Sequence, residues 1–214
     1  MGAYSCVVPL LRSAPRFRVL HALRIKGFAK VEVLSELAVL HETDVESHLT
    51  ELQAAELALY REQRALWQLS PKGREVHVVE LHVDVSRPGF RDVLHGEYEP
   101  FLALNDRFKQ LCGDWQLRDG QPNDHGDPVY DRNVIARLRE LHGEAHPIVA
   151  SIGDNLERFS GYAPRLGSSA DKVVAGEHKM FTGVMCGSYH DVWMELHEDL
   201  ILSQGIDRAK EGSF

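Results

Sequence analysis

The sequence predicts a mainly α-helical protein in two parts: three helices and a β-hairpin come first, and a helical bundle follows. Apolar residues recur at spacings of three and four along most of the chain, which is the period of a helix. The two-residue period of a β-strand is confined to residues 57–69. The length of 214 residues suits two domains of ordinary size. We place these domains at residues 13–85 and 90–209.

The composition is that of a globular protein in a reducing compartment. Hydrophobic residues make up 43% of the chain and charged residues 26%, so a core can form without cross-links. Three widely spaced cysteines, Cys6, Cys112 and Cys186, predict neither a disulfide framework nor a paired-cysteine zinc site. The apolar run Cys6–Leu11 is interrupted by Pro9 and is far shorter than the ~20 residues of a membrane span. We therefore expect a cytoplasmic protein with no membrane partner.

Charge is distributed unevenly along the chain. The net charge of −8 argues against non-specific coating of nucleic acid, because such binding depends on neutralising many phosphates. Residues 13–80 contain nine Lys and Arg against ten Asp and Glu, whereas residues 81–214 contain fourteen against twenty-two. The acidic excess therefore belongs to the second part.

Three helices are expected at the start of the first part. Residues 16–26 have helical periodicity and are followed by Gly27, a helix stop. Residues 31–38 give a second, short helix. Thr43 and Glu46 form a capping box, in which each side chain satisfies the other residue's free backbone N–H, so a third helix is expected over residues 43–56.

A hairpin and a further helix complete this part. On either side of a polar tip at Glu62–Arg64, apolar side chains stand at every second position of residues 57–60 and 65–69. This two-residue period predicts two paired strands. Ser70 is a favourable N-cap, and Pro71 stands at the first helical position, where its missing N–H costs nothing. A linking helix is expected over residues 75–85, before a break at Ser86–Gly89.

This order of elements is that of a winged helix-turn-helix, and the segment Trp67–Arg74 resembles the exit from the wing in MarR-like transcriptional regulators. The resemblance implies that the third helix enters the major groove of DNA and that the hairpin, or wing, reaches the backbone or the minor groove, from a homodimer. It assigns base reading to Asp44, Ser47, His48, Thr50, Glu51 and Gln53, and backbone contact to Arg61, Arg64, Lys72 and Arg74.

The third helix departs from that pattern in its charge. Residues 43–56 contain four carboxylates and no Lys or Arg, so the helix would carry the same sign of charge as the phosphates. Its hydroxyl, imidazole and amide groups can still pair with base edges, with affinity then coming from the wing and from dimerisation. In the alternative interpretation, the winged helix is only a docking or dimerisation module.

The second part reads as an antiparallel bundle. Strong helical periodicity marks residues 97–115 and 134–145, a polar loop separates them at Gly120–Pro128, and Pro147 is expected to start a turn. A helix follows over residues 156–173, with Pro164 as an alternative start. After a loop at Gly176–Gly187, a capping box of Ser188 and Asp191 starts a last helix that runs to Gly205.

Polar and aromatic side chains are dense beside these apolar stripes. The segments that contain them, above all Tyr189–Leu200, resemble a helical domain of poorly characterised winged-helix regulators and, more distantly, the tails of phosphoenolpyruvate-utilising phosphotransferases. The resemblance implies no particular reaction. We expect a small, anionic or aromatic molecule to bind among Trp115, Arg158, Tyr162, Arg165, His190, Trp193, Glu195 and His197.

Each feature of this cluster has a plainer interpretation. Arg158 and Arg165 lie seven residues apart and could clamp an anion beside Tyr162, or could pair with the surplus carboxylates. The imidazoles and carboxylates of residues 190–199 could bind a metal or transfer protons, but such a helix is more often a solvated surface helix. His142 and His146 suggest a metal in the same way, yet the intervening Gly143 and the following Pro147 argue against a regular helix there. We expect no metal site and no cofactor.

Two functions remain open. The first is a ligand-responsive transcriptional regulator that binds DNA as a homodimer and senses a small-molecule effector through the helical domain. The second is an enzyme, or an accessory subunit of one, that uses the winged helix for assembly and has its chemistry among His190, Glu195, His197 and Arg165. The sequence contains no nucleophile elbow, Walker loop, dinucleotide fingerprint or His-Glu-x-x-His run, so no catalytic residue is assigned.

Overall fold

The computed structural model describes residues 10–207, which leaves Cys6 and most of the run Cys6–Leu11 outside the described residues. The protein is mainly helical, as expected. It divides into two compact units. Of the described residues, the first contains 10–93 together with Ser151–Gly161, and the second contains Leu94–Ala150 together with 162–207. The two units are described separately.

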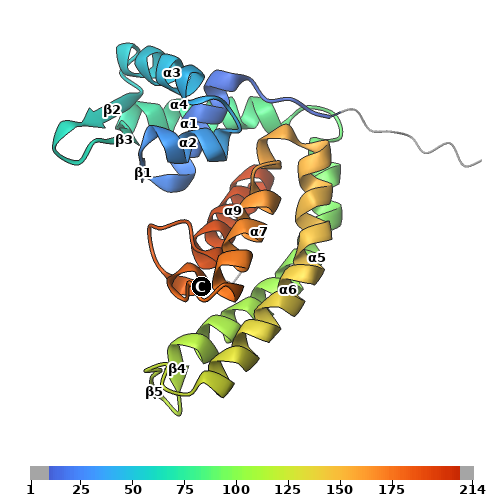
Figure 1. Ribbon diagram of the computed structural model, residues 1–214. Coiled ribbons are helices and arrows are strands. Elements are labelled where there is room, and N and C mark those ends of the chain that lie inside the picture. Colours follow the sequence, from blue (N-terminus) through green and yellow to red (C-terminus); the bar gives the residue numbers. More distant parts are fainter. Residues whose placement is uncertain (1–9, 208–214) are drawn as a thin grey trace, which may run out of the picture. The chain divides into compact units, whose positions relative to one another are not determined.

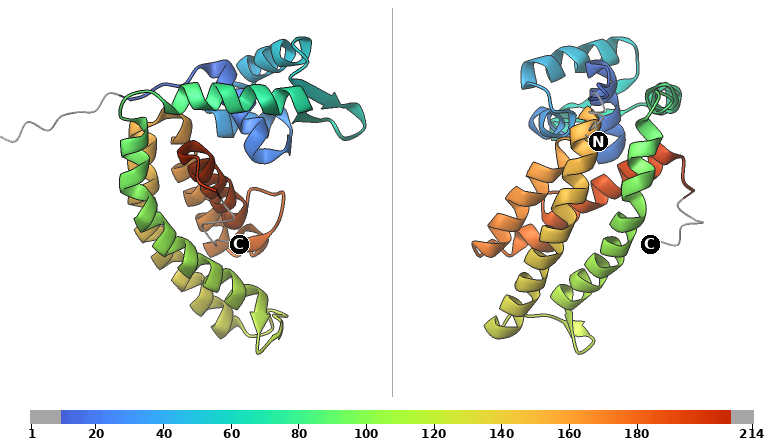
Figure 2. Two further views of the ribbon diagram at one scale, coloured as in Figure 1. Left: turned by 180° about the vertical axis from the view of Figure 1, so that it is seen from behind. Right: turned by 90° about the vertical axis from the view of Figure 1, so that its right-hand side faces the viewer.

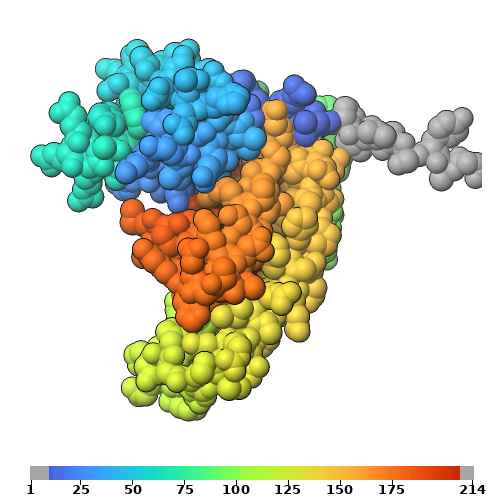
Figure 3. Space-filling model, viewed as in Figure 1, coloured from blue at the N-terminus to red at the C-terminus, as the bar shows by residue number. Residues whose placement is uncertain are grey.

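The first unit contains three helices, a hairpin and a further helix in the order that the sequence predicts, together with a short strand, β1, that the sequence does not predict. Its helices are α1 (Pro15–Lys26), α2 (Val31–Ala38), α3 (Glu42–Ala54) and α4 (Pro71–Val85); its strands are β1 (Phe28–Ala29), β2 (Ala58–Arg61) and β3 (Leu66–Leu69), with a 3₁₀ turn, η1 (Glu62–Arg64), between the last two. The strands form an antiparallel sheet in the order β1–β3–β2. The hairpin of β2 and β3 projects beyond the helices of this unit (Figures 1 and 3).

Local sequence signals explain most boundaries in this unit. Gly27 ends α1 with a left-handed φ of 74°, and the Ser70 hydroxyl accepts the backbone N–H of Gly73 at 2.9 Å to cap α4. The expected capping box of Thr43 is wrong. The third helix begins one residue earlier, at Glu42, with His41 at the N-cap position and no side-chain cap, so Thr43 lies inside the first turn. The linking helix predicted for residues 75–85 is part of α4, which starts four residues earlier, at Pro71.

The core of the first unit is formed by α1, which is buried on all sides over residues 17–23, and by one face each of α2 and α3. Completely buried leucines come from α1, α2 and α3, namely Leu20, Leu23, Leu34, Leu49 and Leu52. The helix α1 packs against α2, α3 and α4. Burying a leucine side chain stabilises a fold by about 1.5–3 kcal/mol, so these leucines hold the three short helices together.

The second unit is a helical bundle. It contains most of α5 (Phe90–Gln116) and α6 (Pro128–Asn155), and all of α7 (Tyr162–Val174), α8 (Lys179–Thr182) and α9 (Tyr189–Gln204), with a small hairpin of β4 (Leu117–Arg118) and β5 (Gln121–Pro122). Its parts of α5 and α6 run side by side in opposite directions (Figures 1 and 2). Ion pairs link Arg107 to Glu144 and Asp114 to Arg137, as this antiparallel arrangement requires.

Several boundaries in the bundle differ from the sequence-based expectation. The helix expected over residues 97–115 is α5, which begins earlier, at Phe90, and includes Pro100. The next helix, α6, continues through Pro147 instead of turning there. An interior proline removes one backbone hydrogen bond and costs about 3 kcal/mol. The apolar stripe Leu138, Leu141, Ala145 and Val149 continues past Pro147 and is buried. Burial of this stripe favours one uninterrupted helix over a turn.

The segment predicted as one helix over residues 156–173 is two elements. Glu157–Phe159 forms a 3₁₀ turn, η2, that belongs to the first unit, and α7 starts only at Tyr162. The predicted cap of the last helix is confirmed in part. Ser188 accepts the backbone N–H of Asp191 at 3.1 Å, but the Asp191 carboxylate accepts from the N–H groups of Cys186 and Gly187 instead of closing the box.

Replacing Gly73 by Ala tests the close packing at the start of α4. A Cβ at Gly73 would lie 2.0 Å from the carbonyl oxygen of Leu57, so the backbone must shift, and we expect the free energy of unfolding to fall by about 1–3 kcal/mol. Gly113→Ala is the matched control, because that helical glycine has no heavy atom within 4 Å of such a Cβ. It should gain roughly 0.5–1 kcal/mol. Urea unfolding measures both changes, and a Gly73→Ala variant as stable as the parent would contradict the packing.

Candidate functional site

The outer face of α3 is polar and exposed. Ser47, Thr50 and Gln53 lie on the surface, and His48 is half-buried. His48 is 3.2 Å from the Glu51 carboxylate, and the Thr50 hydroxyl donates to the backbone carbonyl of Glu46 at 2.9 Å. The proposed base-reading side chains therefore share one helix with exposed carboxylates.

Exposed cations lie on the two elements that follow this helix in the chain, the hairpin and α4. Arg61 on β2 and Arg64 at the tip of the hairpin are exposed, as are Lys72 and Arg74 at the start of α4. Lys72 donates to the carbonyl of Ala55 at 2.9 Å and lies 3.0 Å from the Glu56 carboxylate, so it is attached to the end of α3. Within the described part of the chain, the side chains of Arg64 and Arg74 form no hydrogen bond or ion pair.

Arg61 is held against the sheet. With the Gln68 amide oriented so that its oxygen faces the guanidinium, Arg61 donates two bonds to it, of 2.6 and 3.0 Å. The two residues lie on neighbouring strands, and the rings of Tyr60 and Trp67 pack 5.0 Å apart beside them. These contacts across the two strands fix the Arg61 side chain on the hairpin.

A buried polar network occupies the centre of the first unit. The Asp84 carboxylate accepts from Arg158 at 3.3 Å, from Ser13 at 3.1 Å and from Arg87 at 2.7 Å. Arg158 is only 3% exposed and Asp84 only 7%. A buried charge is costly unless it is paired, and here the pairing links α4, η2 and the segment before α1.

Two buried histidines extend this network in a fixed order of donors. Arg158 lies 2.8 Å from Nε2 of His21, and Nδ1 of His21 lies 2.9 Å from Nε2 of His77. Because a guanidinium only donates, Nε2 of His21 carries no proton. Its proton is then on Nδ1 and is donated to His77. The network therefore selects one neutral tautomer of His21.

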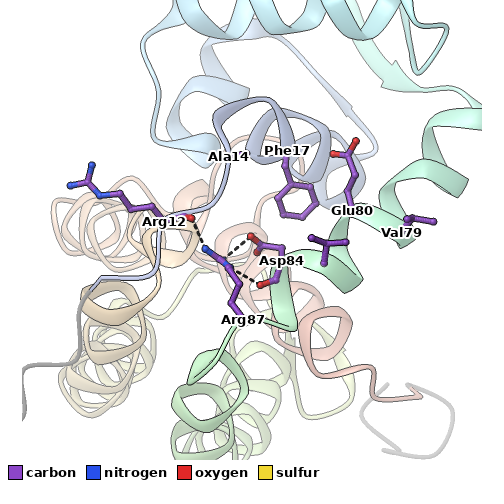
Figure 4. A pocket seen from close by; sticks show the side chains of 8 residues that line it. Arg12, Ala14, Phe17, Val79, Glu80, Asp84 and Arg87 are labelled. Atoms are coloured by element: carbon purple, nitrogen blue, oxygen red, sulfur yellow. Dashed lines mark hydrogen bonds and ion pairs between the residues drawn. The ribbon is translucent and has the colours of Figure 1, made fainter.

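A pocket of about 380 Å³ lies beside this network in the first unit. Phe17, Val79 and Val83 give it apolar walls, and the Arg87–Asp84 pair forms its polar side (Figure 4). Arg87 also donates to the backbone carbonyl of Arg12. This volume lies within the range of small-molecule pockets, roughly 300–1,000 Å³.

Most predicted ligand residues of the second unit have partners inside the bundle. Trp193 donates to Asn105 at 2.9 Å and stacks on Phe101 at 5.0 Å. Tyr162 donates to the buried Asp199 carboxylate at 3.0 Å, and Arg165 pairs with Glu195 at 2.6 Å. Such pairing agrees with the alternative in which these polar side chains stabilise the bundle and do not bind a ligand.

Two buried atoms near Trp193 remain without a hydrogen-bond partner in the described part of the chain. They are Nδ2 of Asn105 and Nδ1 of His190. His197 packs against the Phe101 ring, with centroids 5.4 Å apart, and His190 lies 6.2 Å from Phe108. Asn105 and His190 are the members of this cluster that could still receive a ligand or a water molecule.

The expected anion clamp of Arg158 and Arg165 on one helix face is wrong. Arg158 belongs to η2, outside α7, and lies in the first unit with Asp84. Sequence reasoning missed Asp84, His21 and His77 altogether. Hydrophobic periodicity does not reveal them: His77 and Asp84 lie on the buried face of α4, whereas the valines Val78, Val79 and Val83 of that helix are exposed.

Trp115 forms a second aromatic cluster at the end of α5. Its ring lies 4.4 Å from that of His125 and 4.8 Å from that of Phe181, with His178 at its edge. His125 has a left-handed φ of 57°, which is costly for a residue with a side chain, and its Nδ1 lies 3.1 Å from the buried Asp131 carboxylate. This pairing orients the imidazole and covers Trp115.

Burial determines the ionisation of a third group of side chains, between α5, α6 and α9. It raises the pKa of the Cys112 thiol to about 12, and it raises the pKa of the nearby Tyr189, with a smaller contribution from Cys112. Burial also lowers the pKa of His142, as does the neighbouring His146, while Asp171 opposes the shift. At neutral pH, Cys112 is therefore a thiol and not a nucleophilic thiolate.

Within residues 10–207, no three side chains among His, Cys, Asp and Glu are grouped as a metal site would require. Over the same range, every helix is too short or too polar to span a membrane.

Arg158→Ala tests whether this predicted ligand residue is structural. The substitution removes a buried cation and leaves Nε2 of His21 without that donor, so we expect the free energy of unfolding to fall by about 3–5 kcal/mol. The exposed Arg139 is the matched control, and Arg139→Ala should stay within about 0.5 kcal/mol of the parent. An Arg158→Ala protein with an unchanged urea midpoint would refute the structural role.

Thiol labelling tests the burial of Cys112. In a Cys6→Ser background at pH 8, a maleimide should react with the half-buried Cys186 and leave Cys112 unmodified until the protein is unfolded. Mass spectrometry of peptides locates the label. Equal labelling of both cysteines in the native protein would show that the core around Cys112 is open.

Comparisons with known proteins identify no relative: no family model, no curated protein and no solved structure matches this chain.

Proposed function

We propose that the chain is a DNA-binding transcriptional regulator whose first unit is a winged helix-turn-helix and which acts as a homodimer. The observation that carries this proposal is the order of elements in the first unit. An exposed polar helix, α3, packs on α2 and is followed by a projecting hairpin with the exposed cation Arg64 at its tip. This is the arrangement by which winged helices place one helix in the major groove and the wing on the backbone.

Charge decides which part of this surface supplies affinity. The exposed face of α3 carries Glu42, Asp44, Glu46 and Glu51 and no cation, so phosphates repel it. The wing and the start of α4 carry four cations, of which Arg64 and Arg74 have no ion pair within residues 10–207. In this proposal the wing and α4 bind the phosphates, while Ser47, Thr50 and Gln53 discriminate among bases.

The acidic face of α3 also favours a second candidate function. A helix whose exposed side chains are mostly carboxylates suits contact with a basic protein surface. The first unit would then be a docking module for an enzyme or an accessory subunit, and the two functions differ in whether DNA binds at all.

A small-molecule effector is part of the proposal. The pocket beside Phe17 is of suitable size and lies in the first unit, against the Asp84 network. Most of the residues expected from the sequence lie elsewhere, in the second unit, whereas Arg158 lies in the first. Near Trp193, Asn105 and His190 each keep an atom without a partner among the described residues. Both places support binding of a small molecule, and DNA binding does not depend on which one is used.

Arg64→Ala tests the contribution of the wing to DNA affinity. We expect weaker binding to every DNA sequence, and a plot of log affinity against log salt that flattens by roughly one unit for the lost phosphate contact. The measurement is fluorescence anisotropy with duplexes from the region upstream of the gene, at several salt concentrations.

Two variants complete this experiment. Arg139→Ala removes an exposed arginine of the second unit and should leave both affinity and slope unchanged. Gln53→Ala should instead change which sequence is preferred. A parent protein that binds none of the duplexes at low salt would reject the regulator and favour the docking module.

A further inference from the structure

We propose that His142 and His146 form a binding site for a borderline divalent cation such as Zn²⁺ or Cu²⁺, on the surface of the second unit. The proposal is independent of DNA binding. It starts from the continuity of α6, because the two histidines occupy positions i and i+4 of one uninterrupted helix. Residues so spaced lie one above the other on the same face.

The distance between the two rings suits a shared cation. Their centroids lie 5.7 Å apart. Zinc binds an imidazole nitrogen at about 2.0–2.1 Å, so two rings that share one cation have centroids no more than ~6.5 Å apart. Imidazole is also the side chain that zinc, copper and nickel share as a ligand.

One imidazole is already oriented by a neighbour. Nδ1 of His142 lies 3.4 Å from the hydroxyl of the buried Tyr189. When Nε2 binds a cation, the proton of the neutral ring is on Nδ1 and is donated to the Tyr189 oxygen. Metal-binding histidines are commonly held by such a second bond, which fixes the ring and the tautomer.

Space and charge on α7 favour a cation at this position. Gly167 faces His142, and a Cβ at Gly167 would lie 3.9 Å from Nε2, so the glycine leaves room beside the nitrogen. Glycine inside a helix costs about 0.5–1 kcal/mol relative to alanine. One turn later, the exposed Asp171 acts electrostatically on His142 and supplies negative charge. Because no third ligand is grouped with the histidines in the described residues, water fills the remaining positions of the cation.

His125 and His178 are the competing pair in the same unit, with ring centroids 6.1 Å apart. Both residues lie in loops, and Nδ1 of His125 is already engaged by Asp131. A site on a helix is held more precisely than one on loops, so the helical pair is favoured.

The test is titration of the full chain, stripped of metal by a chelator, with ZnCl₂ in a calorimeter. The parent should bind one Zn²⁺ at this site, and His142→Ala and His146→Ala should each lower the affinity by about tenfold or more. The matched control is the double variant His125→Ala/His178→Ala, which should bind as the parent does.

A second measurement separates binding from damage to the fold. Zn²⁺ should raise the melting temperature of the parent, because the metal binds only the folded protein, and should not raise that of His146→Ala. His146 is exposed, so this variant should melt as the parent does when no metal is present. The proposal is overturned if the parent binds no Zn²⁺, if both helical variants keep the parent's affinity, or if the loop variant loses it instead.

Discussion

The first unit depends on the buried pairing of Arg158 with Asp84. This contact joins residues 74 positions apart in the sequence and connects η2 to α4 and to the segment before α1. A guanidinium at 3% exposure and a carboxylate at 7% are each unfavourable alone, so neither position tolerates loss of the other. The network continues through His21 and His77, and its order of donors is determined because arginine cannot accept. Segments that are distant in the sequence therefore contribute to one polar core.

Burial and pairing with a carboxylate also distinguish the structural cations of this protein from its surface cations. Arg158 and Arg165 are paired with buried carboxylates, whereas Arg64 and Arg74 are exposed and without ion pairs in the described residues. Because Arg64 and Arg74 are exposed, they can neutralise phosphates without leaving a buried charge behind. Since α3 itself is acidic, it repels phosphates, whereas the exposed cations of the hairpin and of the start of α4 attract them.

In the bundle, aromatic packing and polar pairing occur on the same helix faces. Trp193 stacks on Phe101 and donates to Asn105, and Tyr162 donates to Asp199. An indole or phenol that is buried needs such an acceptor, which explains why polar residues interrupt the apolar stripes of α5 and α9. These pairings account for much of the polar density that first suggested a ligand site. Among the described residues near Trp193, they leave Nδ1 of His190 and Nδ2 of Asn105 without a hydrogen-bond partner.

The sequence by itself determined the features that depend on neighbouring residues. Helical and strand periods placed the hairpin and most helices, and Ser70, Gly27 and Ser188 marked ends that the structure confirms, because caps and turns act over three or four residues. Tertiary structure decided the rest. It kept α6 helical through Pro147, because a buried apolar stripe outweighs one lost hydrogen bond, and so placed His142 above His146. It also assigned Arg158 to Asp84, a contact between distant segments that no local pattern could reveal.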